Sequence, residues 1–257
     1  LLDTGLLRPE ELGGLGETGD GPVDYGLQWR YRYPALRVAF ERAREHNPFE
    51  ARYGSIGDFF LRAEEWLRPY ALFRALKGKH GGAPWYTWPA DERSFEAAAK
   101  GGHEAEDSDA FHFSVFLQYL FDGQWRDLRE EAAHRGISIV GDVPIFVAAD
   151  SADVWQHPEE FLLDEDLQPA LVAGVPPDYF SKKGQLWGNP LYDWEAMRAN
   201  GFRWWMRRFT ANFELFDIVR IDHFRGFDAC YGIPAGAKDA TAGEWMPAPG
   251  GELFDTL

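Results

Sequence analysis

The sequence predicts an α/β fold with parallel strands, and three observations indicate it. Residues 137–147, ISIVGDVPIFV, are short and rich in β-branched residues, and they follow a helical pattern closed by Gly136. A second helical pattern over 193–216 runs into a second strand pattern, FDIVRID. Two strands that each follow a helix favour a parallel arrangement in one sheet.

The part of the chain before the first strand is expected to be mainly helical. The pattern over 34–46 begins with proline and predicts a helix. Residues 55–82 predict a second helix that Pro69 interrupts and that Gly81 and Gly82 end. Residues 108–136 predict one long amphipathic helix or two short ones, whereas residues 8–33 are rich in Gly and Asp and are expected to form a loop.

Composition narrows the classes of partner. The 257 residues are 45% hydrophobic and 16% aromatic, with no apolar run long enough for a membrane span. The net charge of −16 repels phosphate backbones and anionic lipid, so we expect neither nucleic acid nor membrane as a partner. A neutral substrate such as a sugar is compatible with this charge.

Cysteine and histidine usage bounds the chemistry further. The single cysteine, Cys230, forbids an internal disulfide, favours a cytoplasmic location and is expected to be a small core residue. The seven His are scattered without the spacing of metal ligands, so we expect neither a metal site nor a cofactor. The sequence opens without Met or a signal peptide, and we expect both ends to be internal to a longer chain.

Charged side chains stand where the two predicted strands end. Asp142 follows ISIVG and Asp222 follows IVRI, and Arg220 shares a strand face with Asp222 because side chains two apart point the same way. We expect this pair to be buried and ion-paired, with Arg220 lowering the pKa of Asp222. An ionised, oriented carboxylate is what attack on the anomeric carbon of a sugar requires. Two alternatives remain open: a structural ion pair, and Asp142 as a cap of the next element.

Aromatic residues are frequent in the connection between the two strands. Tyr179, Phe180, Trp187 and Tyr192 lie in a stretch rich in Gly, Pro and Asn, where stacking on sugar rings is a plausible use. The alternative is packing, because 11 Trp and 20 Phe must mostly form core. A connection this long is typically functional.

Three long motifs carry a resemblance to a known family. The segments GDVPIFVAADSADVW, VAGVPPDYFSKKGQLWGNPLYDW and VRIDHFRGF closely resemble the 4-α-glucanotransferases of the amylomaltase family, relatives of the α-amylases. VDYG, YALFRALKGKHGG and GEWMPAPG match as well, so the likeness extends over nearly the whole chain. The resemblance implies an α/β fold that is part of a (β/α)8 TIM barrel with helical and loop-rich insertions. It also implies α-1,4-glucans, such as maltooligosaccharides and starch or glycogen fragments, as substrates.

The resemblance also suggests a domain organisation. We expect residues 1–107 to form a helical insertion subdomain with partial barrel elements. Residues 108–257 are expected to hold central barrel strands at about 137–142 and 216–222, with a loop-rich insertion over 146–215 as one wall of a cleft.

Roles for individual residues follow from the resemblance by position. Asp222 resembles the nucleophile and Arg220 the cation that supports it. Asp142 resembles the carboxylate that holds the sugar in the donor subsite, and His223 lies beside the nucleophile.

A second set of residues resembles a lid and its lining. The loop around Pro177, Asp178 and Tyr179 resembles a lid over the cleft, and Trp187 is expected to line that cleft. All four are expected to bind substrate.

The remaining carboxylates of the family are expected outside these residues. Its acid/base glutamate and third carboxylate lie on later barrel strands, and Glu244 and Glu252 are poor substitutes because they follow a loop rather than a strand. The resemblance implies a 4-α-glucanotransferase that acts with retention of configuration. Two alternatives remain: an incomplete fragment that only binds glucan, and a glucan hydrolase of the α-amylase type.

Overall fold

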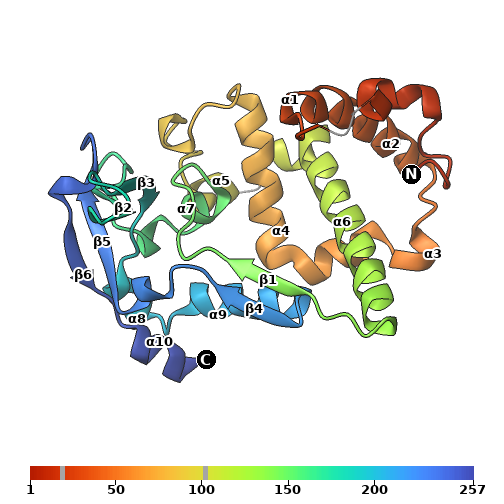
Figure 1. Ribbon diagram of the computed structural model, residues 1–257. Coiled ribbons are helices and arrows are strands. Elements are labelled where there is room, and N and C mark those ends of the chain that lie inside the picture. The colour runs from red at the N-terminus through yellow and green to blue at the C-terminus, as the bar shows by residue number, and fades with distance from the viewer. Residues whose placement is uncertain (18–20, 101–103) are drawn as a thin grey trace. The chain divides into compact units, whose positions relative to one another are not determined.

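The computed structural model describes residues 1–17, 21–100 and 104–257 (Figure 1). The chain forms two compact units, each built from two separate stretches. The first comprises Leu1–Ala75 and Glu104–Gln124, and the second comprises Leu76–His103 and Trp125–Leu257. These compact units differ from the expected domains 1–107 and 108–257. That domain division stays a prediction.

The first unit is helical. Its elements are η1 (Pro9–Glu17), α1 (Tyr25–Leu27), η2 (Gln28–Arg32), α2 (Tyr33–Glu45), α3 (Glu50–Tyr53), η4 (Glu104–Asp107) and the first parts of α4 (Ile56–Lys79) and α6 (Asp109–His134). The expectation of loop over 8–33 is wrong for much of that range. Helix α1 begins after Asp24, whose side chain accepts a hydrogen bond from the Leu27 N–H at 3.0 Å.

Tertiary packing explains why helices α4 and α6 run without a break. Helix α4 continues past Pro69, so the predicted interruption is wrong. Leu67, Ala71 and Leu72 flank that proline with no exposed surface, and their burial offsets the hydrogen bond that proline removes. Helix α6 is one long helix, and a Cβ at its Gly123 would lie 2.3 Å from the Tyr53 ring. The glycine therefore permits close approach of that ring.

The second unit contains the predicted parallel pair. Strands β1 (Val140–Val143) and β4 (Ile218–Ile221) are parallel neighbours (Figure 1). Their register sets Asp142 opposite Arg220. Helix α9 (Arg203–Leu215) packs against both strands. The α/β class is thus confirmed, although both strands are shorter than the expected ranges 137–142 and 216–222.

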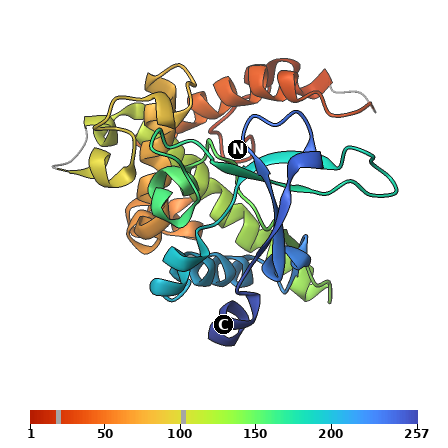
Figure 2. The ribbon, with the colours of Figure 1, turned by 90° about the vertical axis from the view of Figure 1, so that its left-hand side faces the viewer.

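A second sheet in this unit is antiparallel and was not predicted. Its strand order is β3-β2-β5-β6, from β2 (Leu171–Val175), β3 (Gln185–Pro190), β5 (Ala229–Pro234) and β6 (Glu244–Pro247). Residues 176–184 join β2 to β3 in a turn that projects from the sheet (Figure 2). The stretch 146–215 therefore holds more regular structure than its Gly and Pro content suggests.

Shorter elements complete the second unit. The helix expected over 193–216 is divided in two, because Gly201 and Phe202 have φ angles of 74° and 53° between α8 and α9. The other elements are η3 (Trp85–Thr87), α5 (Phe95–Ala99), α7 (Ala152–Gln156), η5 (Pro158–Glu160), α8 (Trp194–Ala199), η6 (Phe224–Phe227), η7 (Ala240–Ala242) and α10 (Gly250–Thr256).

An aromatic core lies beneath α9. Trp205 and Tyr192 are 0% and 2% exposed, with ring centroids 5.5 Å apart, and Phe227 lies 4.9 Å from Trp205. Tyr192 is therefore a core residue, so of the two alternatives for this aromatic it is packing, and not stacking on sugar, that the structure confirms. Cys230 is buried as predicted, and burial raises the pKa of its thiol to about 11.

Two properties of the described residues bear on partners. Among the helices of residues 1–17, 21–100 and 104–257, none combines the length and apolar character needed to cross a membrane. Within the same ranges, no three His, Cys, Asp or Glu side chains come together in a way that could hold a metal ion.

Candidate active site

Arg220 joins the two predicted carboxylates. Its Nη2 lies 2.8 Å from Asp222 Oδ1, and its Nε lies 3.5 Å from Asp142 Oδ1. The parallel register creates this arrangement, because it sets Asp142 opposite Arg220 across the two strands. One guanidinium thus orients two carboxylates from two different strands, which a single strand could not do.

The three charged side chains are open to solvent in this structure. Their exposed fractions are 55% for Asp142, 62% for Arg220 and 59% for Asp222. The expectation that they are buried is wrong, because β1 and β4 pair only with each other within the described residues. Asp142 also lies inside β1, whereas Asp222 directly follows β4 as expected.

The electrostatic prediction for this group is confirmed in direction. The hydrogen bond from the Arg220 guanidinium lowers the pKa of Asp222, and the same bond raises the pKa of Arg220. Asp222 is therefore held ionised, as a carboxylate nucleophile must be.

His223 and Trp187 meet beside this carboxylate. His223 has a left-handed backbone with φ 53°, which turns the chain sharply after Asp222. Its ring lies edge-on to Trp187, with centroids 4.9 Å apart. The Nε2 atom of His223 is buried without a hydrogen-bond partner, and burial lowers the pKa of the imidazole. The ring is therefore favoured in its neutral form at physiological pH.

Trp187 is on a strand rather than in a loop. It lies in β3, it is 37% exposed, and its Nε1–H donates to Gln185 Oε1 at 3.0 Å. The contact with His223 brings β3 to the turn that follows β4. The sequence offers no signal for Gln185, because its role depends on the direction of the indole.

The predicted lid residues occupy the turn between β2 and β3. Asp178 Oδ1 accepts hydrogen bonds from the backbone N–H groups of Phe180 and Ser181, at 2.8 and 2.7 Å. This oxygen closes the turn, as an Asx turn does. Pro177 is exposed, and Tyr179 and Phe180 are 99% and 97% exposed at the tip. The structure therefore brings Trp187 and His223 together and leaves the tip aromatics projecting into solvent.

The two glutamates near the end of the chain, Glu244 and Glu252, lie outside the parallel strand pair. Glu244 follows the segment after η7, as expected, and is the first residue of strand β6, which belongs to the antiparallel sheet. Glu252 lies in α10 and pairs with Arg198 at 2.6 Å.

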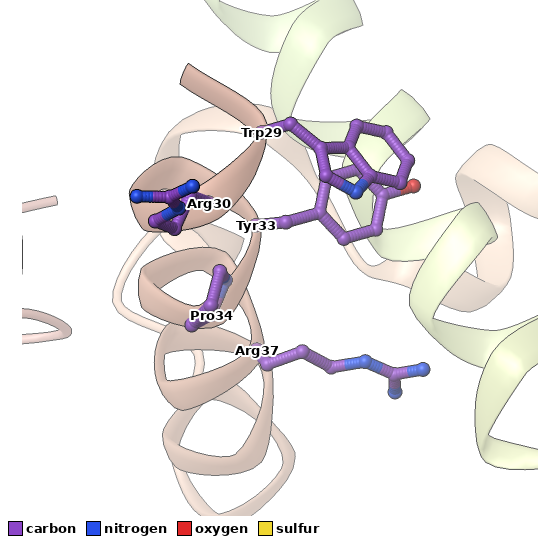
Figure 3. Close-up of a pocket in the computed structure, with 5 residues that line it drawn as sticks. All are labelled: Trp29, Arg30, Tyr33, Pro34 and Arg37. Atoms are coloured by element: carbon purple, nitrogen blue, oxygen red, sulfur yellow. The ribbon is translucent and has the colours of Figure 1, made fainter. Parts of the chain in front are cut away.

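The first unit has a surface hollow of its own. Its volume is about 550 Å³, and Trp29, Arg30, Tyr33, Pro34 and Arg37 line it. Figure 3 shows the Trp29 and Tyr33 rings facing each other, with centroids 4.3 Å apart, and the Arg37 side chain extending beside them. The hollow contains none of the predicted site residues.

Comparison with known proteins decides the family. The glycoside hydrolase family 77 model, described as 4-alpha-glucanotransferase, matches residues 1–257. The chain belongs to this family. The recognised resemblance is thereby confirmed.

Individual relatives agree with this assignment. The 4-alpha-glucanotransferase of Thermus thermophilus is 48% identical over the whole chain, and that of Synechocystis sp. is 45% identical. The chain covers 50% and 51% of their lengths, so it spans about half of the curated relatives that it matches.

A solved structure supports the same fold. The amylomaltase from Streptococcus agalactiae in complex with acarbose has a TM-score of 0.87 and 36% identity, over 98% of this chain and 50% of that chain. This likeness confirms the predicted fold class, part of an amylomaltase TIM barrel.

Proposed function

We propose that the protein containing this chain is a 4-α-glucanotransferase that moves α-1,4-glucan segments between maltodextrins with retention of configuration. The observation that carries the proposal is the Arg220-held carboxylate of Asp222, directly after a strand, in a chain of this family. That the Streptococcus agalactiae amylomaltase was solved with acarbose supports an α-glucan as the ligand class.

In the first step, the Asp222 carboxylate attacks C1 of the donor sugar. A carboxylate–C1 bond forms as the bond from C1 to the leaving 4-oxygen breaks, and a general acid gives that oxygen a proton. We place this acid outside residues 1–257. It would lie in the half of the related 4-alpha-glucanotransferases that this chain does not cover. The 4-hydroxyl of an acceptor glucan then attacks C1, loses its proton to the same group, and frees Asp222.

The neighbouring residues have supporting roles in this proposal. Arg220 keeps Asp222 ionised and aimed, and Asp142 accepts hydrogen bonds from hydroxyls of the donor sugar. Trp187 and His223 line the site beside the nucleophile. Because Nε2 of His223 is buried, Nδ1 is the ring nitrogen proposed to meet a sugar hydroxyl, and in the neutral ring it donates or accepts according to the tautomer.

The exposed tip of the 176–184 turn would contact the glucan. Tyr179 and Phe180 offer two uncovered rings for stacking on sugars, while Asp178 holds the turn and Pro177 leads into it. Covering the glycosyl-enzyme with aromatic rings and acceptor sugar favours transfer over hydrolysis, because water is excluded. We propose a cytoplasmic location, which the single cysteine supports.

The test is incubation of the full-length protein with maltotriose. We expect glucose together with maltodextrins longer than maltotriose. A rise in reducing ends without longer products would make the protein a hydrolase, and no turnover despite glucan binding would favour the binding alternative.

The nucleophile is tested with Asp222→Asn in the same protein. This variant is expected to retain its fold and glucan binding and to lose turnover by at least ~10³-fold, because the carboxylate–C1 bond can no longer form. Activity near that of the wild type would refute the assignment.

A further inference from the structure

The chain that leaves β1 is held by donors from two later segments. Arg208 of α9 donates from Nη2 to the Pro144 carbonyl at 2.6 Å and from Nη1 to the Ile145 carbonyl at 3.3 Å. The Tyr192 hydroxyl donates to the same Ile145 carbonyl at 2.5 Å. Two adjacent carbonyls are therefore fixed by side chains far away in sequence, immediately after the strand that carries Asp142.

The donors themselves are held in place. The Arg208 guanidinium lies over the rings of Trp204 and Trp205, 5.1 Å from each centroid. Tyr192 is 2% exposed and stacks on Phe146 at 5.8 Å. A planar fork that rests on two indoles loses little freedom when it binds two carbonyls, and a lysine could not reproduce both bonds.

The clamped segment touches the turn that presents the proposed nucleophile. Ile145 is 3% exposed, and its Cδ1 lies 2.5 Å from the position that a Cβ at Gly226 would occupy. The Gly226 N–H donates to the His223 carbonyl at 2.9 Å, which closes that turn. The Asp222 N–H donates to the Val143 carbonyl at 3.0 Å, so a second contact joins the end of β1 to the same turn.

We propose that Arg208, together with Tyr192, is a positioning residue: it fixes Ile145, and Ile145 fixes the turn that carries Asp222 and His223. Arg208 touches neither substrate nor the reacting atoms. Its role rests on the proposed function, since it matters for catalysis only if Asp222 is the nucleophile. A displacement of Asp222 by about 1 Å is enough to lower the rate by up to ~10²-fold.

The experiment compares Arg208→Met, Arg208→Lys and the control Arg203→Met in the full-length protein. Arg203 is an exposed arginine of the same helix. We expect Arg208→Met to lower kcat for maltotriose by about 10- to 100-fold with KM within about twofold, and Arg208→Lys to recover part of it. The loss should persist with α-maltosyl fluoride, whose leaving group needs no acid, because the defect lies in nucleophilic attack. Arg203→Met should behave as wild type.

A milder variant covers the case in which Arg208→Met does not fold. Ile145→Val removes only the Cδ1 atom that rests on Gly226 and is expected to lower kcat by about three- to tenfold. A kcat within twofold of wild type for the folded Arg208 variant, or for Ile145→Val in its place, overturns the inference.

A measurement without turnover separates the inference from the proposed function. The proton NMR titration of His223, assigned with His223→Gln, is followed in wild type and in Arg208→Met. Loosening Ile145 should expose the imidazole and raise its pKa toward the ordinary value. An inactive wild type would refute the proposed function. A His223 titration that is the same in Arg208→Met as in wild type would overturn the positioning role of Arg208, whether or not the wild type is active.

Discussion

Gly141 offers a quantitative test of the packing around β1. It pairs with Val219 in the parallel register, next to Asp142. In Gly141→Ala, the new Cβ would lie 2.1 Å from Cδ2 of Phe216, whereas ordinary contact begins at 3.4 Å. The ring must therefore move by 1.3 Å, the difference of 3.4 and 2.1 Å. It packs edge-on against Trp125 at 5.6 Å, so the displacement is transmitted to a second ring. Overpacking of this kind costs about 1–3 kcal/mol of unfolding free energy.

Urea unfolding followed by circular dichroism measures that cost. With an m-value of about 3 kcal/mol per molar, the midpoint should fall by about 0.3–1 M. The matched control is Gly78→Ala in α4, where a Cβ meets nothing within 4 Å. Alanine is favoured over glycine in a helix by about 0.5–1 kcal/mol, so the control midpoint should rise slightly. A Gly141→Ala midpoint equal to or above that of wild type would refute the reasoning.

Two further predictions concern charge. Arg220→Gln removes the hydrogen bond that lowers the pKa of Asp222. That pKa should therefore rise, and the acid limb of the kcat/KM profile should move to higher pH; an unmoved limb would contradict this. Glu160 is 4% exposed, its Oε2 has no hydrogen-bond partner, and burial raises the pKa of its carboxyl group. The stability that this group contributes is therefore complete below its unfolded pKa of 4.5 and is lost as the pH rises through the raised pKa of the folded state. Glu160→Gln should thus be more stable than wild type by about 1–3 kcal/mol near neutral pH and lose this advantage near pH 4, which thermal melts at the two pH values would check.

The elements with strong local patterns could be predicted from the sequence. The helices at 33–45 and 109–134 and the parallel strand pair follow from apolar periodicity and from the glycine that closes the helix before β1. Helix α4 was predicted with a break because the local penalty of Pro69 is large, whereas burial of its neighbours is a tertiary effect. The antiparallel sheet was missed because β2 is short and runs directly into Pro176 and Pro177, whereas β3 contains Gly, Asn and Pro. Pairing rather than propensity makes β3 a strand.

In the candidate site too, the contacts within one strand could be predicted, and those that depend on tertiary structure could not. The contact of Arg220 with Asp222 follows from the two-residue repeat of a strand, so it was found. Asp142 meets Arg220 through the strand register, which the sequence constrains only weakly. Exposure of the three side chains depends on which strands flank β1 and β4. The carbonyls that Arg208 binds have no sequence pattern at all, because backbone direction alone determines them.

The two-stretch construction of the first compact unit has a consequence for synthesis of the chain. Its second stretch ends at Gln124, so the unit lacks part of its residues when Ala75 leaves the ribosome. The 49 residues from Leu76 to Gln124 take roughly 2–10 s to translate at about 5–20 residues per second. During that interval the nascent α2 helix has no Phe113 or Phe116 to cover Phe40, whose ring lies 5.5 Å from each in the folded unit. The apolar face of α2 that carries Phe40 therefore stays uncovered until the second stretch of the unit has been made.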